Sequence, residues 1–244
     1  MCKRRVVIVT GAGHGIGRAC AKRLTGDGYQ VVATDSDACA LSTLAAETGI
    51  ETHQFDVADI AAGHALVTNL TRRLGGADAL VNNAGYTERV SLKELDTNRL
   101  TRMLQVHVRG PLFLAQALAC DLIARQERGA IVNVSSIRAA VAEPGQLHYC
   151  TAKAAVSAFT QALARELMPY DVRVNEVRPG LVATRMTASA RCDPDALARR
   201  LPRIPLSRYA TSCEVASCVA FLLSDGARKI SGQMLTVDGG YLAG

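Results

Sequence analysis

The sequence predicts a doubly wound α/β fold built on a seven-stranded parallel sheet, with helices on both faces. First, short apolar runs rich in β-branched residues alternate with longer helical stretches along all 244 residues, a pattern typical of βαβ units. Second, these runs are nearly continuous rather than alternating, as strands covered on both faces require. Third, a glycine-rich turn joins the first run to the first helix, which indicates a Rossmann-type fold.

The expected elements follow in order from the same patterns, with strands on the apolar runs and helices on the stretches between them. The run near 51–55 is the weakest. The predicted strands span 5–10, 30–34, 51–55, 78–82, 130–134, 172–177 and 233–237. The predicted helices span 15–27, 38–48, 59–74, 97–125, 148–168 and 212–224.

The chain is expected to form one domain, spanning residues 1–244. No repeat, low-complexity tract or linker rich in Pro, Gly and Ser divides it. Residues 184–208 carry six arginines and three prolines, and we interpret them as a substrate-binding flap over the site. The alternative is a solvated connector with one short helix near 193–201.

Composition narrows the class of protein. The net charge is +6, but the basic residues are spread along the chain and aromatic content is 4% without Trp, so we expect no nucleic-acid partner. The apolar run at 6–10 is far too short for a signal peptide or a membrane span, which predicts a cytoplasmic protein with no membrane partner. The eight cysteines form no C-x-x-C pair, and no metal site is expected.

The glycine turn reads TGAGHGIG from residue 10 to residue 17. Glycines there let the backbone approach a pyrophosphate, and the N-terminus of the following helix supplies N–H donors and partial positive charge. The G-x-x-x-G-x-G spacing is a weak signal alone, but its place between a strand and a helix strengthens it. The residues expected to bind a dinucleotide here are Gly11, Gly13, His14, Gly15, Ile16 and Gly17.

Asp35 ends the second predicted strand, where a carboxylate can accept hydrogen bonds from both adenosine ribose hydroxyls. The same carboxylate would repel a 2′-phosphate, and no Lys or Arg stands at 34 or 36. NAD is therefore expected as the cofactor, with NADP as the less favoured alternative. Sequence leaves open that Asp35 is a plain helix N-cap.

Three residues suggest acid/base chemistry. Tyr149 and Lys153 are four apart on a predicted helix, so both project from one face. An ammonium beside a phenol favours phenolate and lowers the pKa of Tyr149 toward neutrality. Ser136 follows the fifth strand, where it would hydrogen-bond a substrate oxygen as charge develops. The alternative is an ordinary exposed helical pair.

These residues resemble the short-chain dehydrogenase/reductase family, and the resemblance covers essentially the whole chain. Its motifs stand in the family's order. They are the glycine turn, Asp56-Val57, Asn82 to Gly85, Ser136, Tyr149 to Lys153, Arg178-Pro179-Gly180, and the tail from Ser231 to Gly240. The resemblance implies an oxidoreductase that transfers a hydride between a nicotinamide cofactor and a secondary alcohol or ketone, with Tyr149 as its acid/base.

The resemblance also implies roles for single positions. Adenine would lie against Asp56 and Val57, the nicotinamide ribose hydroxyls would bind Lys153, and helices 97–125 and 148–168 would pair in a homotetramer or dimer. The remaining cofactor contacts implied are Asn83, Ala84, Gly85, Tyr149, Pro179, Gly180, Val182 and Thr184.

One residue departs from the family pattern, since His107 stands where the family has a catalytic Asn. The family uses that Asn to hold a water that connects the lysine to solvent, partly through its backbone carbonyl. Pro111, four residues later, has no N–H to bond that carbonyl. His107 is thus a candidate for the proton relay, with a packed core residue as the alternative.

The substrate is expected to be a polar small-molecule alcohol or ketone, such as a sugar, polyol or hydroxy acid. Two alternatives remain: a 3-oxoacyl thioester reductase, and a catalytically idle NAD-binding sensor or assembly subunit. The residues expected near the substrate are Arg138, His148 and Arg185, with Glu88, Arg89, Glu143 and Met186 beside them.

Overall fold

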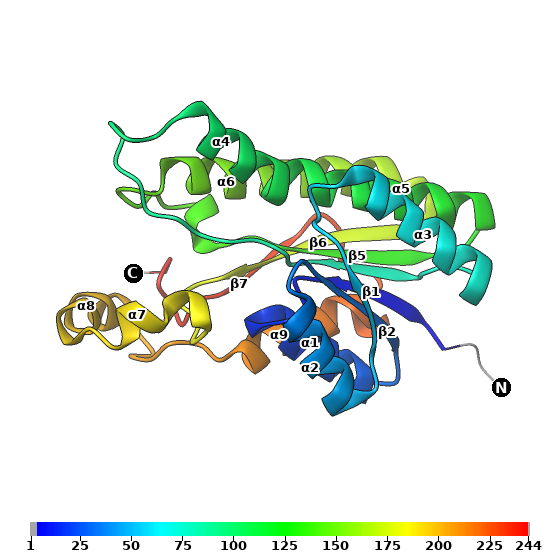
Figure 1. Ribbon diagram of the computed structural model, residues 1–244, viewed down its shortest axis with the longest axis horizontal. Helices are drawn as coiled ribbons and strands as arrows, with labels where there is room; N and C mark the ends of the chain where they lie inside the picture. Colours follow the sequence, from blue (N-terminus) through cyan, green and yellow to red (C-terminus); the bar gives the residue numbers. More distant parts are fainter. Residues whose placement is uncertain (1–3, 244) are drawn as a thin grey trace.

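The computed structural model describes residues 4–243 and shows the predicted seven-stranded parallel sheet (Figure 1). The strand order is β3-β2-β1-β4-β5-β6-β7, with every paired neighbour parallel. The fold-class prediction is therefore confirmed. The strands are β1 Val6–Thr10, β2 Gln30–Asp35, β3 Glu51–Gln54, β4 Ala79–Asn82, β5 Gly129–Val134, β6 Val172–Pro179 and β7 Met234–Val237.

Helices cover both faces of the sheet (Figure 1). One apolar core packs α1, α2 and α9 against the sheet, and a second packs α3, α5 and α6 against its other face. The longer helices are α1 Gly15–Gly26, α2 Ala38–Thr48, α3 Ile60–Leu74, α4 Thr97–Leu104, α5 Gly110–Arg125, α6 Leu147–Leu167 and α9 Ser212–Leu223. Short 3-10 turns lie at Ile137–Ala139, Met168–Tyr170, Arg185–Thr187, Leu201–Arg203 and Asp225–Ala227.

The strand order fixes where a ligand can bind. β1 hydrogen-bonds to β2 on one side and to β4 on the other, so the chain winds from β1 out to β3 and then crosses back to β4 on the other side of β1. A crevice opens at such a switch point, outside the carboxyl ends of the strands. The glycine turn after β1 and the segment after β4 both lie at this end.

Polar side chains set the helix boundaries. Asp37, Asp59 and Asp96 cap α2, α3 and α4 by accepting a backbone N–H of the first turn. Thr211 and Glu214 form a reciprocal capping box at the start of α9. These caps explain why the predicted starts agree with the structure to within one residue.

The stretch predicted as one helix from 97 to 125 contains a break in its hydrogen-bond pattern. Residues Gln105–Arg109 form a π turn between α4 and α5, in which Gly110 N–H donates to the carbonyl of Gln105. Pro111 explains the break, because it has no N–H for the regular pattern. By length and composition Thr97–Arg125 could also cross a membrane, but half of its apolar window is buried inside the protein, as in a core helix.

The segment interpreted as a flap contains two short helices, α7 Ala188–Arg191 and α8 Pro194–Arg200. Both project beyond the sheet (Figure 1). α8 agrees with the short helix expected near 193–201, and Asp193 caps it. That this segment acts as a flap stays a prediction.

Candidate active site

The glycine turn is packed too tightly for a side chain at Gly11, Gly13 or Gly17. A Cβ on Gly17 would lie 2.1 Å from the carbonyl oxygen of Gly11, and one on Gly11 would lie 2.7 Å from the Cα of Ala84. Gly11 also has a φ of +64°, which favours glycine. No side chain caps α1 and no acidic residue stands in its first turn, so its N–H groups are free to bind an anion.

Asn83 ties the segment after β4 to the glycine turn. Its side-chain amide donates to the carbonyls of Thr10 at 2.9 Å and Gly11 at 3.2 Å. In return the Thr10 hydroxyl accepts the N–H groups of Asn83 and Ala84 at 3.0 and 3.1 Å. The two halves of the dinucleotide crevice are therefore held at a fixed separation.

Asp35 faces the glycine turn rather than capping a helix. Its carboxylate accepts the N–H of Gly13 at 2.9 Å and that of Asp37 at 3.0 Å. The cap of α2 is Asp37, which also binds the His14 ring at 2.9 Å. The structure thus excludes the N-cap alternative for Asp35 and places two carboxylates at this end of the crevice.

Close to Asp35, the segment after β3 carries an ion pair that sequence reasoning missed. Arg102 of α4 donates to Asp56 at 2.5 Å, and Asp56 also accepts the N–H of Ala58 at 2.9 Å. Burial raises the pKa of Asp56, but these two contacts outweigh it and leave that pKa below its usual value. Arg102 stands far from Asp56 in the sequence, and no local pattern indicated it.

The three proposed catalytic residues lie together at the carboxyl end of β5. Tyr149 and Ser136 both line the cleft, close enough for the Ser136 hydroxyl to act on the pKa of the phenol, and this hydroxyl accepts the N–H of Arg138 at 3.2 Å. The Lys153 ammonium donates to the carbonyl of Val134 at 3.0 Å and lies 5.7 Å from the centre of the Tyr149 ring. Tyr149 and Lys153 are 9% and 5% exposed, so they are not an exposed helical pair.

The pKa of the phenol differs from expectation. Burial raises the pKa of Tyr149 to about 12, and the nearby Ser136 side chain only partly opposes this. Burial also lowers the pKa of Lys153 to about 8, with the Glu176 carboxylate acting in the opposite direction. Burial shifts the pKa of each group more than the charge of its neighbour does. The Lys153 ammonium is directed at the Val134 carbonyl and not at the phenol. The expected lowering of the Tyr149 pKa is therefore wrong for this structure.

Glu176 is a fully buried carboxylate on β6 that the sequence analysis passed over. It accepts hydrogen bonds from Ser135, from Ser157 at 3.0 Å and from Arg178 at 3.1 Å. Its negative charge is what favours the ammonium of Lys153 in the buried interior. A carboxylate in the middle of a strand predicted to be covered on both faces was the signal that could have found it.

His107 is a buried, neutral residue beside Tyr149. Its Nε2 donates to the Tyr86 carbonyl at 2.8 Å, and its ring meets the Tyr149 ring edge-on at 5.5 Å between centres. Burial and the nearby Lys153 hold the pKa of His107 well below its usual value. A Cβ on Gly85 would lie 2.3 Å from this ring, so the imidazole has room in this position because residue 85 has no side chain.

The backbone around His107 offers a carbonyl that a relay could use. Pro111 cannot donate to the carbonyl of His107, and the π turn at Gln105–Arg109 bends the helix at this point. Asn82 holds the bend in place by donating to the carbonyl of Pro111 at 3.1 Å. This arrangement is compatible with a water held at the His107 carbonyl.

Pro111→Ala is expected to slow turnover about tenfold, because it restores an N–H that competes with a relay water for the His107 carbonyl. His107→Asn should keep or increase activity. The measurement is kcat with dinucleotide affinity as the control, since neither residue is proposed to bind the dinucleotide. Full activity of Pro111→Ala would show that the carbonyl has no part in proton transfer.

One cleft of about 570 Å³ collects most of the predicted site. Gly13 and Gly17 do not line it. Gly13 donates its N–H to Asp35, and Gly17 packs against the carbonyl of Gly11. Residues that sequence reasoning missed include Phe55, Tyr86, Arg102 and Val106. The predicted residues that line it are Gly11, His14, Gly15, Ile16, Asp35, Asp56, Val57, Asn83, Ala84, Gly85, His107, Ser136, Tyr149, Lys153, Pro179, Gly180, Val182, Thr184 and Arg185.

The predicted substrate residues do not all lie in this cleft. Arg185 lines it together with Met186, whereas Arg138 is directed at Glu143, 2.7 Å away. His148 has no exposed surface and neither of its ring nitrogens has a partner among the described residues. A direct substrate contact by His148 stays a prediction.

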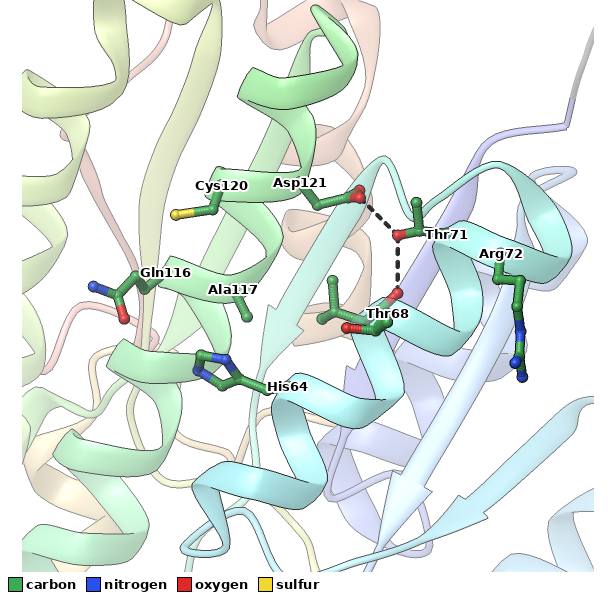
Figure 2. Close-up of a pocket in the computed structure, with 9 residues that line it drawn as sticks. His64, Thr68, Thr71, Arg72, Gln116, Ala117, Cys120 and Asp121 are labelled. Atoms are coloured by element: carbon green, nitrogen blue, oxygen red, sulfur yellow. Dashed lines mark hydrogen bonds between the residues drawn. The ribbon is translucent and has the colours of Figure 1, made fainter.

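A second hollow, of about 490 Å³, lies between α3 and α5, and no residue of the cleft lines it (Figure 2). The Asp121 carboxylate that lines this hollow already accepts hydrogen bonds from the Thr71 hydroxyl at 2.6 Å and from the Arg125 guanidinium at 2.8 Å. It therefore presents no acid and base aimed at a common point. The cleft beside the glycine turn is the candidate active site.

Comparison with known proteins agrees with this geometry. The sequence model described as Enoyl-(Acyl carrier protein) reductase matches residues 11–242. L-xylulose reductase of Caenorhabditis elegans is 36% identical over 237 residues, which are 96% of this chain and 94% of that protein.

Two solved structures share the fold along their whole length. A gluconate 5-dehydrogenase from Burkholderia cenocepacia J2315, in complex with NADP and tartrate, has a TM-score of 0.93 at 30% identity and covers 100% of this chain and 97% of its own. A 4-hydroxyisoleucine dehydrogenase complexed with NADH has a TM-score of 0.93 at 28% identity, with 99% and 100% covered. The chain belongs to the short-chain dehydrogenase/reductase family of oxidoreductases.

Proposed function

We propose that this protein interconverts a secondary alcohol and a ketone on a polar small molecule, with NAD as its cofactor. The observation that carries the proposal is the shared cleft: Ser136, Tyr149 and Lys153 line it together with the glycine turn. The L-xylulose reductase and gluconate 5-dehydrogenase named above support a sugar, polyol or hydroxy acid as substrate.

The crevice fits a dinucleotide. The bare backbone of Gly11 and the uncapped N-terminus of α1 suit a pyrophosphate, and the Asp35 carboxylate suits a ribose diol. Two carboxylates at that end, Asp35 and Asp37, disfavour a 2′-phosphate, which is the reason for proposing NAD rather than NADP. When bound, the nicotinamide supplies the hydride donor or acceptor.

The chain's own residues handle the proton and the substrate oxygen. Tyr149 gives its phenolic proton to the ketone oxygen during reduction and takes a proton from the alcohol during oxidation. Ser136 hydrogen-bonds the same oxygen and orients it. Lys153 holds the nicotinamide ribose and passes the proton toward solvent near the His107 carbonyl.

A 3-oxoacyl thioester is the second candidate substrate, because the matching family model is described as an acyl-carrier-protein reductase. The polar cleft wall at Arg185 and Thr187 fits an acyl chain less well than a hydroxylated molecule. An idle NAD-binding subunit is disfavoured because Ser136, Tyr149 and Lys153 are all in place. We further propose a single domain, a flap at 184–208, a homo-oligomer and a cytoplasmic location.

A substrate panel tests the proposal. Purified protein is mixed with NAD and with sugars, polyols, hydroxy acids and a 3-hydroxyacyl thioester, and nicotinamide absorbance is followed. We expect turnover of at least one hydroxylated substrate and none of the thioester. Turnover of the thioester alone would replace the proposed substrate class, and no turnover with NAD or NADP would overturn the proposal.

A further inference from the structure

A cavity of about 510 Å³ lies between the flap and the loops after β4 and β5. It is called the arginine cavity here, because four of its lining side chains are arginines. Its lining residues are Arg89, Glu143, Ser189, Asp193, Ala196, Arg199, Arg200 and Arg203. None of them lines the cleft that holds Tyr149, so this is a separate concavity beside the active site.

A fifth arginine connects the arginine cavity to the catalytic residues. Arg138 donates its backbone N–H to the Ser136 hydroxyl at 3.2 Å, and its guanidinium binds Glu143 at 2.7 Å. Its side chain is only 11% exposed, and its Nη1 is buried without a partner among the described residues. An unpaired buried guanidinium nitrogen is unfavourable unless a ligand satisfies it.

The charges around the cavity are unbalanced. Glu143 is shared by Arg89 at 2.9 Å and Arg138 at 2.7 Å, and the charge of Arg203 also acts on it. Arg199, Arg200 and Arg203 form no ion pair with any residue in 4–243. The other lining carboxylate, Asp193, already accepts two N–H groups of α8. The cavity therefore has an excess of positive charge.

Tyr241 holds two of these arginines on one aromatic ring. The guanidinium carbon of Arg203 lies 4.7 Å from the ring centre and that of Arg138 lies 5.9 Å from it. Tyr241 itself is 8% exposed and packs with Ile137 and Ile204. Stacking on a fixed ring orders a guanidinium before a ligand arrives, which lowers the entropy lost on binding.

We propose that the arginine cavity binds an anionic group, a carboxylate or a phosphate, at the far end of the substrate whose reacting carbon lies at Ser136 and Tyr149. Arg199 and Arg203, which line the cavity, are the specificity-determining residues, and Arg138 is a positioning residue that shares the Tyr241 ring with Arg203. This inference rests on the proposed function and narrows it, because it selects sugar acids, hydroxy acids or sugar phosphates over neutral sugars and polyols.

Binding to the NADH-loaded protein tests the inference without requiring turnover, since an alcohol cannot react with the reduced cofactor. Calorimetric titrations compare tartrate, xylonate and gluconate with erythritol, xylitol and sorbitol, and add xylitol 5-phosphate, which has no ketone to be reduced, as the phosphate arm. At least one anion should bind tenfold or more tightly than every neutral polyol. Its affinity should fall as salt is raised, whereas polyol affinity should not change.

Arg199→Gln and Arg203→Gln should each weaken anion binding about tenfold while leaving polyol binding unchanged, because both side chains line the cavity and neither lines the cleft that holds Tyr149. Arg128→Gln is the matched control, because Arg128 is exposed on another part of the surface and its loss changes the net charge equally. If no anion binds better than the polyols in the wild type, or if the variants lose both ligand classes alike, the inference is overturned. Turnover of neutral polyols without any anion preference would leave the proposed function standing and remove only this inference.

Discussion

Tyr149→Phe is expected to lower kcat about a hundredfold to ten-thousandfold while dinucleotide affinity stays nearly unchanged. The substitution removes only the transferable proton, and loss of a general acid/base typically costs this much. Tyr170→Phe is the matched control, because Tyr170 is 49% exposed at the end of α6 and is not among the residues of the cleft. Near-normal turnover of Tyr149→Phe would remove Tyr149 from the mechanism.

The same residue predicts a pH dependence. Burial raises the pKa of Tyr149 to about 12, so the phenol is protonated at neutral pH and ready to donate a proton to a ketone. Alcohol oxidation needs the deprotonated form, whose population grows about tenfold per pH unit below that pKa. The oxidation rate of the wild type should therefore rise with pH above 7, and Tyr149→Phe should lose this dependence.

Replacing Asp35 by Ser and Ser36 by Arg is expected to reverse the cofactor preference from NAD to NADP. Asp35 offers charge-assisted hydrogen bonds to a ribose diol, each contributing roughly 1.5 to 3 kcal/mol, or about tenfold to a hundredfold in affinity. The double substitution removes the repulsion of a 2′-phosphate and supplies a planar cation that suits it.

The comparison to make is kcat/KM with NAD and with NADP, for both proteins and one substrate. Asp35→Asn is an informative control, because an amide of the same shape still has one oxygen for the N–H of Gly13 or Asp37. It should weaken NAD use without creating NADP use. A wild type that prefers NADP would show that Asp35 only supports the glycine turn.

The sheet could be predicted because each strand is specified locally. Val6 to Thr10 is a continuous buried run, and the turn after it can be recognised from glycine spacing alone. Pro111 is the local signal for the break at Gln105–Arg109, because its missing N–H removes a backbone hydrogen bond within one helical turn. The helix starts marked by N-cap residues such as Asp37 and Thr211 could also be predicted from the sequence.

The parts that could not be predicted depend on contacts between distant segments. Arg102 binds Asp56 and Arg89 binds Glu143 only because the fold brings distant segments together. The direction of the Tyr149 pKa could not be foreseen either, since it is set by how completely the phenol is buried. Helix spacing predicted that Tyr149 and Lys153 would be neighbours, but it could not predict how completely the fold shields both side chains from solvent.

The contact between Gly85 and His107 makes the two positions interdependent. A Cβ at 85 would lie 2.3 Å from the Cε1 atom of the imidazole, so a side chain there requires the ring to move. The ring also meets the Tyr149 ring edge-on, with 5.5 Å between the centres, and its Nε2 donates to the Tyr86 carbonyl. A change at 85 would therefore reach the proposed acid/base through the imidazole, although Gly85 itself is not proposed to take part in proton transfer.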